Sequence, residues 1–185
     1  MAVILSCVLL LPVRALAVGI SFETVDLPDS TPGDDLWEYA YRVQGFDFSR
    51  DQGFSVFFDP GLYGALSNPV PVGSDWDLLA IQPDRFLGPG LYDALARVDH
   101  ATVDVSFRIA FVWLGGLGRT PGSQAFEIFE QDADGNFLGG IASGATLPVP
   151  EPGTATMLAL GLFSTTLHAR RRLRRQVVPR RTPTT

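Results

Sequence analysis

Hydrophobic and polar residues alternate along much of the chain between residues 18 and 146. Successive side chains of a strand point to opposite faces, so a period of two predicts strands with one buried face. The clearest runs are Trp37, Tyr39, Tyr41 and Val43, and then Val103, Val105, Phe107, Ile109, Phe111 and Trp113. A long strand with a single apolar face needs a second layer to cover it.

Five more segments have the composition of strands, and turn residues separate them. These segments are 21–27, 54–58, 76–82, 125–130 and 137–142. Asp134-Gly135-Asn136 lies between two apolar runs and predicts a hairpin. The pattern therefore predicts an all-β fold, a β-sandwich of about seven strands spanning residues 18–146.

Two short segments have a spacing that is typical of helices. Leu91, Leu95 and Val98 follow an i, i+4, i+7 pattern within residues 90–99. Residues 61–66 have the length of a single helical turn. We expect a short helical interruption at each place.

The region after the predicted sandwich begins with alternating prolines at 148, 150 and 152. Each proline lacks an N–H and moves the residue before it out of the α region. Residues 147–151 should therefore be extended, exposed and accessible to another protein. The proline-rich region spans 147–153, and Pro152 can begin a helix because its missing N–H costs nothing in the first turn.

An apolar segment and an arginine cluster follow in that order. Residues 154–169 contain no carboxylate and no arginine, and a helix of this length crosses most of a bilayer core of about 30 Å. The cluster consists of Arg170, Arg171, Arg172, Arg174 and Arg175. Arginines at a helix end can snorkel toward the interface, and such clusters stay cytoplasmic. The order predicts a transmembrane helix over 154–169, an arginine-rich cytoplasmic tail over 170–185 and a domain on the outer side.

This end of the chain resembles the PEP-CTERM sorting signal of Gram-negative bacteria. The resemblance rests on the Pro150-Glu151-Pro152 motif, the short apolar segment and the arginine cluster, in that order. It implies that an exosortase, a membrane cysteine protease, recognises Val149, Pro150, Glu151 and Pro152. It further implies a transient hold in the inner membrane, followed by release to the cell surface or the extracellular space.

The first 17 residues have the features of a secretory signal peptide. Residues 2–11 are largely apolar, and Ala15-Leu16-Ala17 fits the small-x-small cleavage pattern. We expect the mature chain to start near Val18. The alternative is that residues 1–17 form a buried element of the domain.

Charge is divided unevenly along the chain. All twenty acidic residues and only six arginines lie between Glu23 and Glu151, which gives this stretch a net charge of −14. Such a body does not attract nucleic acid by charge. Cys7 is the single cysteine and lies within the expected signal peptide, so the mature chain is expected to contain neither disulfides nor cysteine-ligated metal.

Few residues suggest catalysis. His100 is the one histidine between residues 18 and 149, and the chain has no nucleophile elbow, zinc-ligand spacing or phosphate loop. Asp132, Asp134 and Asn136 alternate as the first ligands of a calcium loop do, but Ser143 occupies the position where that loop needs a bidentate acid. The same three residues also suit a hairpin turn in which the Asp and Asn side chains support the backbone, and we expect the turn rather than a calcium loop. Exposed aromatic residues could bind sugar, and Trp76 between two aspartates is the least certain to be buried.

We therefore expect an exported, non-catalytic protein of the cell surface or extracellular matrix that needs no cofactor. One alternative is a secreted carbohydrate- or calcium-binding module. Another is an envelope protein that remains anchored by its tail. Expected partners are the exosortase, the inner membrane and the exopolysaccharide of the host.

Overall fold

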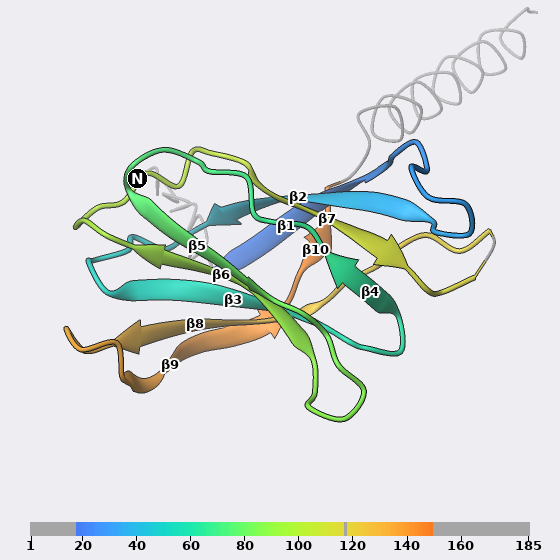
Figure 1. The fold of residues 1–185 in the computed structure, drawn as a ribbon. Helices are drawn as coiled ribbons and strands as arrows, with labels where there is room; N and C mark the ends of the chain where they lie inside the picture. Colours follow the sequence, from blue (N-terminus) through green and yellow to red (C-terminus); the bar gives the residue numbers. More distant parts are fainter. Residues whose placement is uncertain (1–17, 117, 150–185) are drawn as a thin grey trace, which may run out of the picture. The chain divides into compact units, whose positions relative to one another are not determined.

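Two β-sheets packed face to face form the described part of the protein (Figure 1). The computed structural model describes residues 18–116 and 118–149. Contacts divide the chain into two compact units, Met1–Pro148 and Val149–Thr185, and the sandwich belongs to the first. The described residues contain strands and turns but no helix, and therefore no helix that could span a membrane.

Ten strands make up the two sheets. They are β1 (Gly19–Asp26), β2 (Leu36–Gln44), β3 (Gln52–Phe58), β4 (Tyr63–Leu66), β5 (Trp76–Ile81), β6 (Gly90–Ala96), β7 (Phe107–Trp113), β8 (Ala125–Gln131), β9 (Phe137–Ala145) and β10 (Leu147–Pro148). The first sheet has the order β10-β1-β2-β7-β4, and the second has the order β5-β6-β3-β8-β9. All neighbours are antiparallel except β10, which runs parallel to β1.

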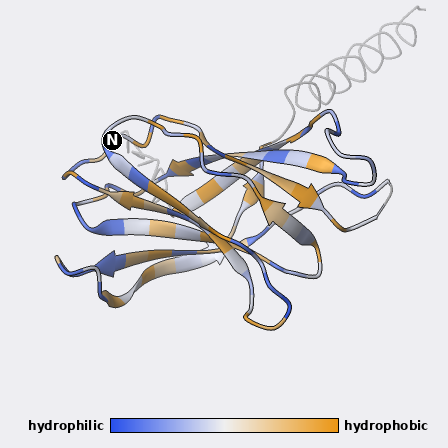
Figure 2. Ribbon diagram, in the orientation of Figure 1, coloured by the Kyte–Doolittle hydropathy of each residue, from blue (hydrophilic) through white to orange (hydrophobic). Residues whose placement is uncertain are grey.

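Aromatic residues of both sheets fill the space between the layers. Tyr39 of β2 stacks on Phe111 of β7 with ring centroids 4.8 Å apart, and Phe54 of β3 meets Phe107 edge to face at 5.0 Å. Buried positions alternate with less buried ones along β6 and β7. Figure 2 shows bands of apolar and polar residues along the strands. The all-β, two-sheet prediction is confirmed, and each of the seven segments expected to be strands contains one.

Both helical predictions are wrong. Residues 90–96 form β6, which lies between β5 and β3 in the second sheet, and residues 63–66 form β4 at the edge of the first. The i, i+4 spacing of Leu91 and Leu95 also fits a period of two. In the structure these leucines lie on the outer face of β6, while Tyr92, Ala94 and Ala96 are buried.

The long strand predicted for 103–113 is shorter than expected, because β7 begins at Phe107. Val103 and Val105 still pack against the core, but they do so from a loop. The Asp75 carboxylate fixes this loop by accepting hydrogen bonds from the backbone N–H and the hydroxyl of Thr102. Alternation alone does not distinguish a strand from a loop that packs on a core.

Candidate functional site at the carboxyl end of the sandwich

The last residues of the sandwich pass from one sheet to the other at Thr146. β9 ends at Ala145 in the second sheet, and β10 starts at Leu147 in the first. Thr146 is fully buried, and its Oγ1 accepts a hydrogen bond of 2.9 Å from the backbone N–H of Gln124. The Thr146 N–H donates in return to the Gln124 carbonyl at 2.8 Å. The crossing is therefore pinned on both sides by a single residue.

Gln124 connects this crossing to the aromatic core. Its side-chain oxygen accepts a hydrogen bond from the buried hydroxyl of Tyr41, and its amide nitrogen donates to the Phe57 carbonyl at 3.3 Å. Burial is the main cause that raises the pKa of Tyr41, so the hydroxyl keeps its proton and remains a donor. Residues of two strands, β2 and β3, thus converge on the loop residue that holds Thr146.

β10 is a short edge strand shaped by proline. Leu147 and Pro148 pair in parallel with Ser21 and Phe22 of β1. Proline has no N–H, so the donors of this segment come from the residues between the prolines. Prolines on a sheet edge leave few donors for another strand and protect against further pairing. The expected extended and exposed conformation is observed at residues 147 and 148, and Pro150, Glu151 and Pro152 lie outside the described residues.

The first and last strands of the sandwich are neighbours. β1 begins at Gly19, next to the position where the signal peptide is expected to end, and β10 pairs with β1. The expected leader and the proline-rich region therefore join the domain through adjacent strands. The expected signal peptide (1–17), transmembrane helix (154–169) and arginine cluster (170–175) all lie outside the described residues.

The family model of the PEP-CTERM protein-sorting motif matches residues 148–172. This confirms the resemblance drawn from the Pro-Glu-Pro motif, the apolar segment and the arginines. The described fold and the match together define a class: an all-β sandwich that is followed directly by a PEP-CTERM sorting motif.

Two other comparisons add little. No curated protein matches the chain. A cohesin module from a family 33 glycoside hydrolase of Clostridium perfringens is similar in structure, with a TM-score of 0.39 and 9% identity, over 72% of this chain and 98% of that module. A similarity of this size carries no argument about function.

The three calcium candidates come together in the turn between β8 and β9. The Asp132 carboxylate accepts hydrogen bonds from the backbone N–H groups of Asp134 and Asn136 at 3.0 and 2.8 Å, and from the Asn136 side-chain amide at 2.9 Å. These bonds lower the pKa of Asp132, the Asn136 amide contributing most. The oxygens that a cation would need are therefore engaged by the turn. Among the described residues, no three acidic, histidine or cysteine side chains form a metal-binding group.

His100 pairs with Asp47, which lies 53 residues away in the sequence. Its Nδ1 lies 2.7 Å from an Asp47 oxygen, and both side chains are exposed at the surface. The residue has a positive φ of 55°, which places it in a tight turn. The pair is an exposed surface contact and gives no support for general-base catalysis.

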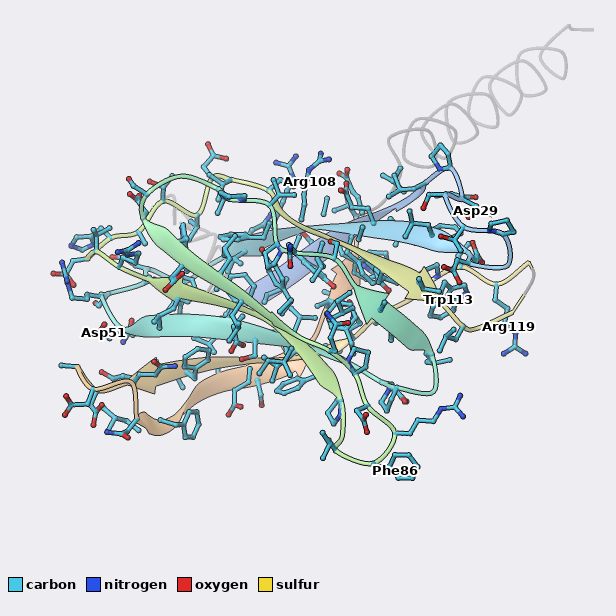
Figure 3. The ribbon with its side chains drawn as sticks, in the orientation of Figure 1. Asp29, Asp51, Phe86, Arg108, Trp113 and Arg119 are labelled. Atoms are coloured by element: carbon cyan, nitrogen blue, oxygen red, sulfur yellow. The ribbon has the colours of Figure 1, made fainter. Side chains whose placement is uncertain are left out.

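Most aromatic side chains are part of the core. Trp76 is buried, and its indole N–H donates to the Thr102 carbonyl at 2.9 Å. A cavity of about 500 Å³ lies beside the partly buried Trp37, with Asp26, Asp29 and Arg119 in its lining. Figure 3 shows Asp29 and Arg119 at the same end of the sandwich. The Trp37 indole N–H donates a hydrogen bond of 2.7 Å to the Asp35 carboxylate, so this donor is already engaged by the segment that precedes β2.

Two functional features escaped the sequence analysis. Gln124 and Thr146 read as ordinary polar residues, since their pairing joins positions 22 residues apart through a fold that alternation does not specify. The sequence analysis gave no role to Phe86 and Leu87, which are almost fully exposed in the loop between β5 and β6. Two adjacent large apolar residues in a loop bounded by Pro83 and Pro89 were the signal that could have marked them.

Proposed function

We propose that this chain is an exported, non-catalytic protein of the cell surface or extracellular matrix that an exosortase recognises through its C-terminal signal. The observation that carries the proposal is the PEP-CTERM match over residues 148–172, which begins within the strand that completes the sandwich. The folded domain is the part that is exported, and the segment after β10 is the sorting signal.

In this proposal the signal has three parts with different physical roles. Val149, Pro150, Glu151 and Pro152 form the rigid peptide that the exosortase reads. Residues 154–169 hold the chain in the inner membrane for a time. Arg170, Arg171, Arg172, Arg174 and Arg175 remain on the cytoplasmic side and fix the orientation.

Anchoring of the fold next to the motif supports this division of roles. The crossing at Thr146 and the pairing of β10 with β1 hold the chain up to Pro148 in the sandwich. A protease can then act beyond this point without unfolding the cargo. An acidic body also suits release, because it gains nothing from anionic lipid.

Cell fractionation tests the proposal. We compare the wild-type chain with a Glu151→Ala variant in host strains that have or lack the exosortase gene. The wild-type chain should leave the membrane fraction only in the first strain, and Glu151→Ala should reduce its release. Equal release of the wild-type chain in both strains would instead favour a permanently anchored or independently secreted protein.

A further inference from the structure

The hairpin between β5 and β6 ends in a projecting apolar tip, formed by Arg85, Phe86 and Leu87. The side chains of Phe86 and Leu87 are 98% and 91% exposed. Figure 3 shows Phe86 at the end of this hairpin, with its ring directed away from the sheets. These are the two most exposed large apolar residues among the described residues, and together they are a candidate contact surface.

The tip is held in its projecting shape. Asp84 Oδ1 accepts hydrogen bonds from the N–H groups of Phe86 and Leu87 at 2.7 and 3.0 Å. Asp84 and Gly88 exchange two backbone hydrogen bonds, of 3.0 and 2.8 Å, across the base of the loop. Gly88 has a φ of 122°, which side-chain-bearing residues rarely adopt. The apolar side chains are thus presented in one geometry, which lowers the entropy cost of binding.

A cavity of about 460 Å³ lies close to the tip. Its apolar lining comes from Phe57, Pro60, Leu62, Tyr63 and Pro89. Pro89 directly follows Gly88 at the base of the loop, so the cavity and the tip are neighbours on the domain. An apolar cavity of about 150 Å³ can hold a benzene ring, so this one has room for a phenyl and an isobutyl group.

The charges of the two features are complementary. The tip carries the exposed Arg85, and the cavity lining includes the exposed Asp59. The Asp59 carboxylate is held in place by a hydrogen bond of 2.7 Å from the Gly61 N–H. An arginine at the rim of one surface facing an aspartate at the rim of another favours a specific register.

We propose that the tip of one copy of this chain inserts into the cavity of a second copy. Phe86 and Leu87 fill the cavity, and Arg85 pairs with Asp59. Because tip and cavity are neighbours on the same domain, a two-fold axis can make both insertions at once, as in an isologous dimer. This goes beyond the proposed sorting function and does not depend on it.

A second copy fits these features better than other occupants do. A lipid surface could take up the tip, but it would leave the cavity empty and would be opposed by the net charge of −14. A sugar could use the aromatic Phe57 and Tyr63 of the lining, but it would leave the exposed Phe86 and Leu87 of the tip without a partner. A second copy satisfies the tip, the cavity and both charges together.

Cross-linking of the full-length chain in its host tests the proposal. Two differently tagged versions are co-expressed in a Cys7→Ser background, one with Leu62→Cys in the cavity and one with Leu87→Cys in the tip. A short bismaleimide should join them into a mixed dimer, because each chain has one reactive position. Replacing Leu62→Cys by Leu138→Cys, on the exposed part of β9, supplies the matched control and should give background only.

Charge reversal makes the test specific. Asp59→Arg in the cavity chain should lower the yield of mixed dimer about fivefold, and Arg85→Glu added to the tip chain should restore it. The proposal is overturned if the mixed dimer does not exceed the Leu138→Cys control, or if two Leu87→Cys chains join to each other more readily. Restoration by the second charge reversal excludes misfolding as the cause of the loss.

Sedimentation of the purified full-length chain in detergent provides an independent readout. Replacing both Phe86 and Leu87 by serine removes almost fully exposed side chains, so the thermal unfolding midpoint should stay unchanged at concentrations where both proteins are monomeric. The dissociation constant of the dimer should rise about 30-fold or more, the loss expected for central apolar anchors. A wild-type chain that still sediments as a monomer at about 100 µM would contradict the proposal.

Discussion

Buried tyrosine hydroxyls show how individual residues shape the core of this domain. The Tyr39 hydroxyl donates to the Gly122 carbonyl at 2.7 Å and lies 3.0 Å from that of Tyr63. Tyr41 donates to Gln124. Tyr92 is the exception, because its buried hydroxyl has no hydrogen-bond partner among the described residues.

These differences predict opposite outcomes for the same chemical change. Tyr41→Phe leaves the Gln124 oxygen buried and unpaired and should lower the free energy of unfolding by about 1–3 kcal/mol. Tyr92→Phe removes an unpaired polar atom and should leave stability unchanged within about 0.5 kcal/mol, or raise it. Urea denaturation of both variants measures their free energies of unfolding. An equal loss of this free energy in Tyr41→Phe and Tyr92→Phe would contradict the difference assigned to their hydrogen bonds.

Two aspartates should affect stability in opposite directions as pH changes. Burial raises the pKa of Asp93, with the Ser55 hydroxyl opposing the shift, whereas hydrogen bonds from Asn136 lower that of Asp132. Ionised Asp93 therefore costs stability, and this cost disappears as the pH falls below the ordinary carboxyl range near pH ~4. Ionised Asp132 contributes stability that is present above that range and is lost as the pH falls.

Asparagine variants measured from pH 7 to pH 3 test both signs. Asp93→Asn should be more stable than the wild-type chain at pH 7, with the difference shrinking toward pH 3. Asp132→Asn should be less stable at pH 7, and its difference should also shrink on acidification. Parallel changes of the same sign in the two variants would contradict these assignments.

Sequence alternation located Tyr39 and Tyr41 in the core but did not identify their partners. Tyr41 meets Gln124 across 83 residues of chain, and such a pairing depends on the order of strands in each sheet. Asp132 and Asn136 lie in one turn, so their contact was within reach of local reasoning. Local pairs are predictable from sequence, whereas contacts between the sheets are not.

At the scale of elements, the sequence analysis missed strands that are short or that carry apolar residues on both faces. β6 is a central strand, and its outward Leu91 and Leu95 have a spacing that a helix shares. β4 has four residues, which is too short to establish any period. β10 has two residues and owes its pairing to the crossing at Thr146. These three strands account for the difference between seven expected and ten observed.

The role of the Thr146 crossing can be measured by replacing one hydroxyl group with a methyl group. Thr146→Val keeps the shape of the side chain but leaves the Gln124 N–H without its acceptor, which should cost about 1–3 kcal/mol. β10 should then separate from β1 more often, and limited proteolysis near residues 147–149 should become faster. Thr146→Ser keeps the hydroxyl and serves as the control. Equal proteolysis of the two variants would exclude this role.

At the scale of the whole molecule, the chain combines a two-sheet β-sandwich with a PEP-CTERM sorting motif. The order of the Pro-Glu-Pro motif, apolar segment and arginines was recognisable from sequence because each part is local, and the family match over 148–172 confirmed the resemblance. The order of strands was not predictable, since alternation assigns faces but not neighbours. The pairing of β10 with β1 holds the chain in the sandwich up to Pro148, where the first compact unit ends and the sorting motif begins.

The mass of the released protein tests this account most directly. Intact mass spectrometry of the extracellular chain, from cells that have the exosortase, should show a product that ends near Glu151 and lacks the arginine cluster. Cells without the exosortase should retain an uncleaved C-terminus in the membrane fraction. A released chain that still carries Arg170 to Thr185 would contradict the claim that the segment after β10 is a removable sorting signal.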